Sequence, residues 1–565
     1  MEELLSSQEN PKVLVQGSVK DVSGGGIPGV NIVLKGMETT GTVSDFQGSF
    51  SIEIPENSEL IFSFMGYKTQ TVTVGNQQFL EIVLEEEVET LEELIVVGYG
   101  VQKKSVVTGS ISSISGSDIV QNKPANVGQA LSGRAAGVIV SPASGQPGAA
   151  PRVNIRGVGT NGNSSPLYII DGLPMGDLNA VNPADIASME VLKDATSAAI
   201  YGARAANGVI LITTKKGKAG TARLTYDGFY GVQQAYNIPE MANSAQYIDI
   251  MKQYNRNDGE PSMEWINALD PNIDTDWFDV ITQPAAITEH NITSTFGGEK
   301  GNTLISLSYR GQDGIIGGDQ AAFKRYSARM NTQQEVKDWL TLGLNMNVLH
   351  IDKNSMSMGT NNWNTAAYAF SMEPTAPVHA GPGTDYPNYP YYTEDGYAIS
   401  STIAGIWNPM HFMEVQDANN NRKTNRLYGN AFLKLEPVEG LVLKTDIATN
   451  LSNSNQRKYT PEYYYNTLHM NDFNKISQSS NYAMFWQWEN TATYTYSHKG
   501  HNFGGLLGLS MSQNNYVFFS GERQKLPSEA DEMMIGGIWA LETRPRLLIM
   551  EEPMHGMPWL PYSEG

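Results

Sequence analysis

The residue types that support catalysis or metal binding are few and scattered in this sequence. The eight histidines are spread along the chain, and the close pair His498 and His501 in HKGH is more typical of an exposed turn than of a metal site. The segment DANNNR at 417–422 lacks the glycine and glutamate of a calcium loop. No G-x-S-x-G or P-loop motif occurs. We therefore expect no catalytic residue, no metal site, no cofactor and no enzyme activity.

Two glycine-rich segments, GGGIPG at 24–29 and GVGTNG at 157–162, match the spacing of a dinucleotide-binding loop. No helix is expected after either segment, and Pro28 precedes another strand, so neither predicts a dinucleotide site. The acidic residues of ADIASMEVLKDATSAAIYG at 184–202 have no histidine or nucleophile beside them. They do not indicate a catalytic acid cluster.

Aromatic side chains in a long insertion near 354–424 are better candidates for binding chemistry. Aromatic faces can stack on sugar rings, and amides beside them can bind hydroxyl groups. This composition suits a glycan ligand, although packing within a large loop is the favoured alternative for any single residue. The candidate ligand-contacting residues are Trp363, Tyr389, Tyr391, Tyr392 and Trp407.

The segment 219–534 must position these loops, and its residues alternate strand by strand. In NTLISLSYR, Ile305 falls on one face and Arg310 on the other. About nine such segments follow one another, separated alternately by short turns and by long insertions near 235–285 and 354–424. This pattern, with aromatic residues near strand ends, favours a transmembrane β-barrel over a soluble sandwich with one wet face. The insertions are then expected on the extracellular side.

Composition limits the class of protein and of partner. Among 565 residues, 55 are glycine, 27 are tyrosine and only 17% are charged, which indicates β structure with many turns. The net charge of −21 argues against nucleic acid as a partner. The absence of cysteine excludes a disulfide scaffold, and no run of 18 apolar residues predicts a transmembrane helix. The start, MEELLSSQEN, lacks the features of a signal peptide, so either the protein is not exported or its true start precedes Met1.

Residues 12–84 are expected to form a small β-sandwich. The segments KVLVQGSVKD, GVNIVLKG, GSFSIEIP, ELIFSFMGY and KTQTVTVG alternate in hydrophobicity, and Gly48 stands where a tight turn requires a positive φ. Residues 81–93 then hold seven glutamates and no basic residue, and should stay extended or disordered. The β-forming stretch Leu94–Val97 follows, unpaired in its local sequence. It is either a buried strand or a docking peptide that adds to the sheet edge of a partner.

The stretch LEELIVVGYGVQKK begins a series of motifs that continues with ANVGQALSGRAAGVIV, VNIRGVGT, PLYIIDGLP and NPADIASMEVLKDATSAAIYGARAANGVILITTKKG. The series resembles the plug of SusC-like (SusC/RagA) TonB-dependent outer-membrane transporters of Bacteroidota, and the sandwich before it resembles their carboxypeptidase-regulatory-like domain. The resemblance covers residues from about 12 to 218. By this resemblance the opening peptide is the TonB box, which pairs as a strand with TonB. Its residues are Glu92, Glu93, Leu94, Ile95, Val96, Val97, Gly98, Tyr99 and Gly100.

The resemblance implies a mainly β fold. The implied domains are a carboxypeptidase-regulatory-like β-sandwich at 12–84, an acidic linker with the TonB box at 85–117, an α+β plug domain at 118–218, part of an antiparallel transmembrane β-barrel at 219–534, and an atypical tail at 535–565. In the family, Arg156 in NIRG and Asp171 in IIDG would help to seat the plug. The alternative is that each is a solvated turn charge.

The chain also departs from the family. Plugged transporters of this kind form barrels of about 22 strands, whereas the alternation here gives about nine. Beyond residue 534 the alternation stops, which suggests a truncated or frame-shifted reading frame. An open sheet would leave unpaired edges in lipid, so we expect that this polypeptide alone makes no working pore.

The function implied is active import of a nutrient, an oligosaccharide or a peptide, across the cell outer membrane. TonB, with inner-membrane ExbB/ExbD, would pull the plug from the periplasm, where the N-terminal domain lies. A SusD-like lipoprotein and outer-membrane lipid are the other implied partners. The alternatives are a signalling receptor, a plain binding protein built from sandwich and plug, and a non-functional fragment.

Overall fold

The computed structural model describes most of the chain. The described residues are 12–21, 24–35, 37–55, 58–64, 67, 69–75, 79–84, 94–97, 100–103, 110–121, 124, 126–142, 144–194, 198–217, 220–258, 264–267, 269–298, 300–356, 364–401, 405–417, 420–498, 501–526 and 550–551. The chain forms two compact units, residues 1–108 and residues 109–565. The atypical tail expected at 535–565 lies outside the described residues, apart from residues 550 and 551.

The first unit contains a β-sandwich of two antiparallel or mixed sheets. Its strands are β1 (Lys12–Lys20), β2 (Asn31–Leu34), β3 (Met37–Val43), β4 (Ser49–Pro55), β5 (Glu59–Ser63), β6 (Gln70–Thr73) and β7 (Phe79–Val83), in the orders β4-β1-β7 and β3-β2-β5-β6. Side chains alternate between core and solvent along β4, because successive residues of a strand point to opposite faces. Ile32, Ile54, Leu60 and Phe62 are fully buried between the sheets. The predicted β-sandwich is confirmed.

The turn before β4 explains a glycine that stood out in the sequence. Gly48 has φ = 79°, and a Cβ atom there would lie 2.3 Å from the carbonyl oxygen of Val19. Asp45 closes the same turn, since its carboxylate accepts hydrogen bonds from the amides of Gln47 (2.9 Å) and Ser49 (2.8 Å). Only glycine fits this position, as the sequence predicted.

Replacing Ile32 with valine in the isolated sandwich is expected to lower the free energy of unfolding by about 0.5–1.5 kcal/mol. The removed methyl group leaves a small void in a core position that is 0% exposed. Urea unfolding followed by circular dichroism measures the change. Leu14→Val is the matched control, because Leu14 is 49% exposed on β1 and its loss should cost less than about 0.5 kcal/mol. Equal effects at both positions would contradict the core assignment.

The β-forming stretch that follows the acidic linker is paired, which corrects one expectation. Strand β8 (Leu94–Val97) pairs antiparallel with β9 (Gly100–Lys103), in a register that joins Leu94 to Lys103 and Val97 to Gly100. The two strands are close neighbours in the chain, and such neighbours commonly pair antiparallel. Glu92, Glu93, Gly98 and Tyr99 lie outside the described residues.

The second unit begins with an α+β domain. Its elements are β10 (Ile111–Ser115), α1 (Gly116–Gln121), α2 (Val127–Ala130), β11 (Val138–Ser141), β12 (Arg152–Ile155), β13 (Leu167–Ile170), β14 (Leu173–Met175), η2 (Pro183–Asp185), β15 (Ile186–Leu192), η3 (Ala199–Ala205) and β16 (Val209–Thr214). Five strands form one sheet in the order β10-β15-β16-β13-β14, and β11 pairs with β12. The central strands β15 and β16 are buried along most of their length, and this burial includes the polar Glu190 of β15.

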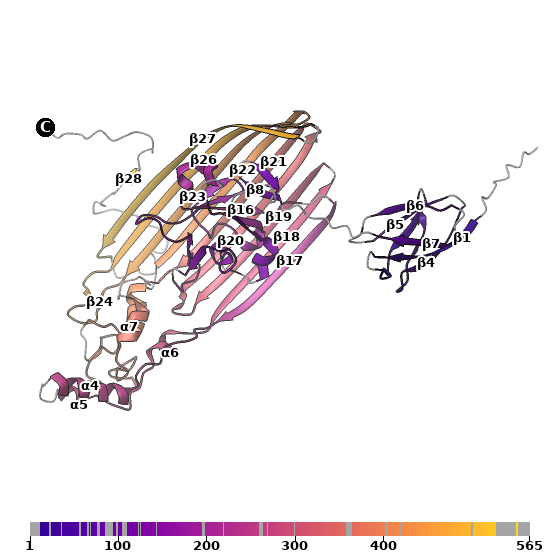
Figure 1. Cartoon of the computed structure of the whole chain (residues 1–565). Helices are drawn as coiled ribbons and strands as arrows, with labels where there is room; N and C mark the ends of the chain where they lie inside the picture. The colour runs from indigo at the N-terminus through magenta and orange to yellow at the C-terminus, as the bar shows by residue number, and fades with distance from the viewer. Residues whose placement is uncertain are drawn as a thin grey trace, which may run out of the picture. The chain divides into compact units, whose positions relative to one another are not determined.

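The rest of the unit is dominated by one large antiparallel sheet (Figure 1). Its strands, each paired with the next, are β17 (Gly220–Gln233), β18 (Ala285–Gly298), β19 (Gly301–Gly314), β20 (Gly318–Lys337), β21 (Leu340–Asn354), β22 (Asn420–Val438), β23 (Leu441–Thr460), β26 (Lys475–His498), β27 (His501–Gln524) and β28 (Met550–Glu551). On β19, Ile305 and Leu307 are exposed on the outer face, whereas Arg310 is buried on the inner face. The alternation expected from the sequence is therefore confirmed.

The two long insertions fold together at one end of this sheet, near α6 and α7 in Figure 1. Their elements are α4 (Ser244–Asp258), α5 (Glu264–Asn267), α6 (Trp277–Ile281), α7 (Thr365–Ser371), α8 (Pro409–Phe412) and η4 (Met413–Asp417), and the short strands β24 (Tyr463–Tyr464) and β25 (Met470–Asn471) lie in a third connection. The indole of Trp277 donates to the carbonyl of Glu373 (2.9 Å), and the rings of Phe278 and Phe370 meet edge to face. Among the described residues, no helix is long and apolar enough to cross a membrane.

Candidate functional site

The α+β domain packs against the inner face of the large sheet. Its core cluster includes Phe323, Leu349, Ile351, Tyr428 and Ala448, which the strands β20–β23 contribute from the sheet. Side chains of the domain thus share one core with this inner face of the sheet, which is called the wall below. The domain approaches the sheet closely at Gly148. A Cβ atom at residue 148 would lie 2.1 Å from the ring of Phe323.

Arginines of the wall make the central polar contacts. Arg310 on β19 is 2% exposed and forms an ion pair of 2.7 Å with Glu289 on β18. Its guanidinium also donates to the carbonyl of Pro124 in the α+β domain (3.3 Å). Glu289 accepts a further hydrogen bond from the amide of Asn291 (2.8 Å). This buried pair therefore belongs to the wall and reaches the domain through one neutral contact.

Two more arginines of β20 contact the domain through neutral acceptors. Arg325 donates to the carbonyls of Asn179 and Val181, both at 3.4 Å. Arg329 donates to the carbonyl of Lys215 (2.7 Å) and to the hydroxyl of Thr214. Further bonds across this contact are Asn182 Nδ2 to Asn291 Oδ1 (2.6 Å), Arg426 Nη1 to Asp177 Oδ2 (3.1 Å), Tyr428 Oη to Ala180 O (3.1 Å) and Gln146 Nε2 to Met356 O (2.5 Å). The domain is held by many separate polar bonds.

Asp171 is linked to this network through one intervening residue. Its carboxylate accepts hydrogen bonds from the amide (2.9 Å) and the hydroxyl (2.5 Å) of Thr214, whose hydroxyl oxygen accepts from Arg329 of the wall. Asp171 has φ = 47°, a left-handed conformation that is uncommon outside glycine. The bonds to Thr214 at the end of β16 hold it there.

Arg156, the other predicted seating residue, is placed differently. It also has a left-handed φ, 57°, and its backbone amide donates to the carbonyl of Gly137 (2.7 Å). Its side chain is exposed, and within the described part of the chain it forms no hydrogen bond or ion pair. The structure therefore joins Asp171 to the wall, but not Arg156.

The candidate aromatic residues of the second insertion divide into two groups. Trp407 is 3% exposed and stacks on Tyr465 with ring centroids 4.9 Å apart, and Tyr389 is half-buried and donates its hydroxyl to the carbonyl of Ile399 (3.1 Å). Burial raises the pKa of Tyr389 above its ordinary value. Both residues therefore pack within the insertion, which is the alternative favoured above for any single aromatic residue.

The other group is accessible. Tyr391 and Tyr392 are 50% and 40% exposed, so their rings can meet a ligand. Trp363 lies outside the described residues. Beside Trp407, His411 is 1% exposed between aromatic rings, and burial lowers its pKa. Its burial places His411 in the packed core of the insertion, and the lowered pKa keeps it uncharged near neutral pH.

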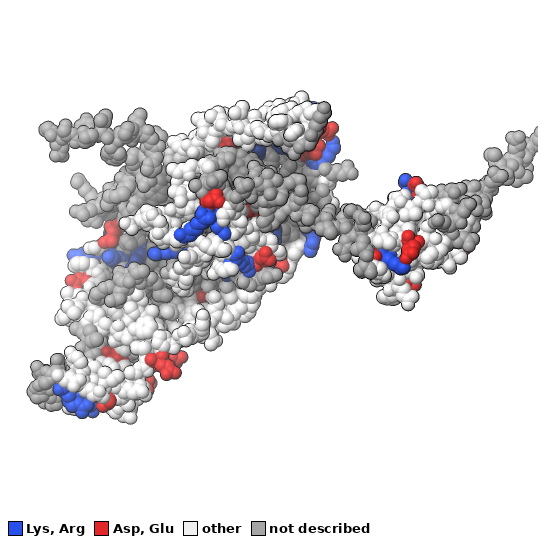
Figure 2. Space-filling model, in the orientation of Figure 1, with Lys and Arg blue, Asp and Glu red and all other residues white. Residues whose placement is uncertain are grey.

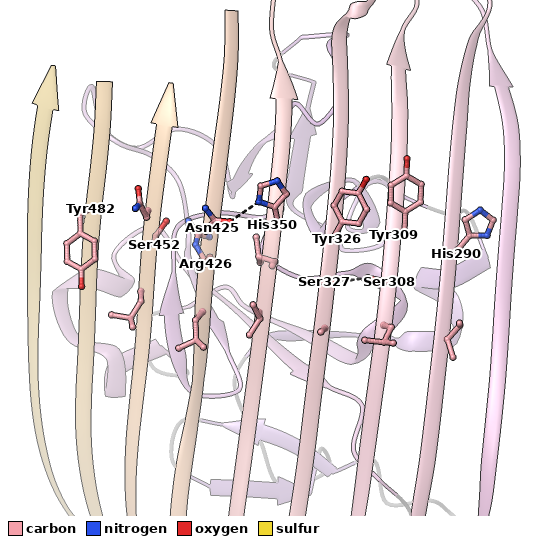
Figure 3. Close-up of a pocket in the computed structure, with 18 residues that line it drawn as sticks. His290, Ser308, Tyr309, Tyr326, Ser327, His350, Asn425, Arg426, Ser452 and Tyr482 are labelled. Atoms are coloured by element: carbon pink, nitrogen blue, oxygen red, sulfur yellow. Dashed lines mark hydrogen bonds between the residues drawn. The ribbon is translucent and has the colours of Figure 1, made fainter. Parts of the chain in front are cut away.

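The outer face of the sheet carries a row of rings that the sequence analysis did not find. His290, Tyr309, Tyr326 and His350 are register partners on neighbouring strands and stand side by side in Figure 3. The row continues through Asn425, Asn453 and Tyr482, and His350 is hydrogen-bonded to Asn425 (2.8 Å). We call these seven residues the aromatic belt. The register between successive strands aligns these residues.

The aromatic belt separates two kinds of surface. On the same face, the residues two positions from the belt toward the short turns are apolar. They are Ile292, Leu307, Ala328, Val348, Leu427 and Leu451. The residues two positions from the belt toward the insertions include the charged Lys324, Asp352 and Lys423. Tyrosine and histidine rings have an apolar body and a polar tip, so a row of them fits the boundary between lipid and water.

Comparison with known proteins identifies the family. The model of the TonB-dependent Receptor Plug Domain matches residues 103–209, and that of the CarboxypepD_reg-like domain matches residues 15–96. TonB-dependent receptor P26 of Formosa agariphila is 33% identical over 528 residues, which cover 92% of this chain and 51% of that protein. TonB-dependent receptor SusC of Bacteroides thetaiotaomicron is 32% identical over 415 residues, 70% of this chain and 39% of SusC. The chain belongs to the SusC-like TonB-dependent receptors.

The receptor chain spans about half the length of P26 (51%). The RagAB peptide importer in its "open-open" state matches the fold with a TM-score of 0.68 and 24% identity, over 81% of this chain and 53% of that one. These comparisons confirm the mainly β fold with sandwich, plug and antiparallel barrel sheet. The relatives are receptors and not enzymes, which confirms that expectation. From here on the α+β domain is called the plug.

Proposed function

We propose that the receptor imports an oligosaccharide across the outer membrane, with TonB supplying force to the plug. The observation that carries this proposal is the plug itself, which is held on the inner face of the sheet by many separate hydrogen bonds and few ion pairs. Each neutral bond contributes only about 0.5–1.5 kcal/mol net. A pulling force can therefore break them in sequence.

The direction of the chain supports an assignment of the two sides. Gly217, which follows β16 at the end of the plug, is tightly packed at Thr303, and β17 begins at Gly220 opposite Gly297, at the short-turn end of the sheet. We place this end, the TonB box and the sandwich in the periplasm. The insertions then face the outside, and the aromatic belt lies at the lipid boundary nearer to them.

The TonB box acts by strand addition in this proposal. Within the box of Glu92 to Gly100, strand β8 would leave β9, or offer its free edge, and pair with TonB, which ExbB/ExbD energise from the inner membrane. Strand β8 is joined to β9 by only four register pairs, so exchanging this partner for another strand is a small change in pairing. Asp171 then seats the plug at rest, through Thr214 and Arg329. Arg156 remains a proposed seating residue without a wall contact among the described residues.

The cargo and the outer partner follow from the insertions. Tyr391 and Tyr392 present rings that suit sugar faces. A SusD-like lipoprotein would cover the insertions, as the family resemblance implies. The RagAB relative is described as a peptide importer, so peptide is the alternative cargo. A signalling receptor is a second alternative, favoured only if ligand binding changes gene expression without uptake.

A cell lacking the full-length gene tests the proposal. We expect the mutant to lose growth on one class of oligosaccharide, and the complemented strain to take up labelled oligosaccharide only while the proton-motive force is intact. A protonophore should stop uptake within minutes. Lost growth on peptides instead, or uptake that a protonophore does not affect, would contradict the proposed cargo or the proposed energy source.

Replacing Tyr391 and Tyr392 together by alanine is expected to weaken oligosaccharide binding to the full-length receptor by roughly tenfold, because each ring contact contributes about 0.5–1.5 kcal/mol. Isothermal titration with the oligosaccharide found by the growth test measures the affinity. Tyr236→Ala is the matched control, since Tyr236 is 89% exposed on the other insertion. If both variants bind as the parent does, these rings are not contacts.

A further inference from the structure

We infer that the opened channel selects acidic oligosaccharides, which carry carboxylate or sulfate groups, through Arg310, Arg325, Arg329 and Arg426 of the inner wall. This inference rests on the proposed import of an oligosaccharide and adds the chemical class of the cargo. The four residues, called the wall arginines, lie on β19, β20 and β22 and all contact the plug. When the plug moves, the groups that they contact on it leave.

The wall arginines are buried with incomplete pairing. Arg310, Arg325 and Arg329 are 2%, 1% and 5% exposed. Within the described chain, Arg325 and Arg329 form no ion pair with a carboxylate, and their plug partners are carbonyl or hydroxyl oxygens. Buried donor atoms without a hydrogen bond to any described residue are Arg310 Nε, Arg325 Nε and Nη2, Arg329 Nη1 and Arg426 Nε.

Seating the plug does not by itself explain arginine at these positions. A neutral glutamine could donate to the same carbonyls, whereas a buried guanidinium carries a large desolvation cost unless an anion pairs with it. Among the described residues, neither Arg325 nor Arg329 forms an ion pair while the plug is in place, although the carboxylates of Glu289 and Asp185 lie near enough to act on the charge of Arg325. The arrangement makes sense if the charges act when the plug has moved and cargo replaces it.

The positive charge continues along the wall. Lys353 and Arg422 are register partners on β21 and β22, two residues nearer the insertions than the level of Arg325. Glu289 offsets Arg310, and Asp177, which pairs with Arg426, belongs to the plug and moves with it. In Figure 2 blue Lys and Arg side chains form a short row at the left of the second unit. Lys353 and Arg422 therefore extend the positive charge of the wall arginines toward the insertions.

Guanidinium groups recognise the proposed cargo directly. A guanidinium donates two parallel hydrogen bonds to a carboxylate or sulfate, and the charge strengthens both. Arg325 and Arg329 are four residues apart on one strand, so their α-carbons stand about 13 Å apart along the path. An acidic oligosaccharide could pass from one guanidinium to the next without losing all its partners.

The test uses the full-length receptor in planar lipid bilayers, with urea at a concentration that loosens the plug while the barrel stays inserted. The probes are dextran sulfate oligomers, uncharged dextran of equal length, and polyglutamate. We expect dextran sulfate to halve the current at a concentration about tenfold below that of dextran. In R325Q/R329Q the difference should shrink below about threefold. R325K/R329K keeps the charge and should keep most of the preference.

The control is K324Q, because Lys324 lies next to Arg325 on the opposite face of β20 and its loss should leave the preference unchanged. Equal block by dextran and dextran sulfate in the parent, or an unchanged preference in R325Q/R329Q, would overturn the inference. Block by polyglutamate but not by dextran sulfate would overturn the sugar assignment. If R325Q/R329Q does not insert, R329Q alone decides. The current needs no TonB, so this test can fail while energised uptake remains intact.

Discussion

Deleting residues 92–100 from the full-length receptor is expected to abolish energy-dependent uptake and to leave ligand binding at the cell surface unchanged. The deletion removes β8 and the first residue of β9, and with them the strand proposed to pair with TonB. The insertions proposed to bind ligand belong to the second compact unit and are not altered. Labelled-ligand uptake and binding to energy-depleted cells, measured side by side, separate the two activities.

Deleting residues 92–100 also shortens the chain between the sandwich and the plug, so the experiment needs a control for length. Replacing residues 92–100 with a glycine–serine segment of equal length keeps the length and should also abolish uptake. The same replacement at residues 85–90 keeps β8 and should leave uptake near the parent level. Loss of surface binding together with uptake would mean that the deletion damaged folding, and full uptake would contradict the assignment of the TonB box.

Replacing Glu289 with leucine is expected to destabilise the full-length receptor by about 3–5 kcal/mol. The change leaves Arg310, which is 2% exposed, without its carboxylate, and it removes the acceptor of Asn291. The temperature at which purified receptor loses its compact form on SDS gels measures the loss. We expect a clear drop in that temperature.

Two further variants make this prediction specific. In Glu289→Leu/Arg310→Leu both charges are gone, and stability should recover most of the way to the parent. Glu436→Leu removes one partner of the exposed pair between Lys434 and Glu436 and should cost less than about 1 kcal/mol. A double variant as unstable as Glu289→Leu would show that the pair is not the source of the loss.

Much of the fold follows from local pattern. Alternation with a period of two placed Ile305 outside and Arg310 inside before any register was known, because every strand obeys the same geometry. Gly48 was likewise predicted from its own turn. Helix ends are less well defined by local pattern: α2 ends at Ala130, and both Gly133 (φ = 71°) and Gly137 (φ = 75°) follow it with the positive φ typical of a helix C-terminus. With two glycines available, the sequence does not say which one ends the helix.

The site was less predictable, because it depends on which strands become neighbours. Arg310 and Arg325 are register partners although the turn Ile315–Gly317 and two half-strands separate them in the chain. Trp407 looked like a ligand contact because aromatic composition does not distinguish a ring that packs on Tyr465 from one that faces solvent. Asp171 was singled out by resemblance, and its link to Arg329 through Thr214 appears only in three dimensions.

The joining of the two insertions limits how such receptors can acquire new specificities. The carbonyls of Pro374 and Ala376 accept hydrogen bonds from Thr275, and Trp277 bonds to Glu373, so residues on either side of the strands Ala285–Asn354 depend on each other. A recombination event that exchanged only one insertion with a relative would expose the apolar surface of the other. Natural or engineered chimaeras should therefore inherit both segments from the same parent.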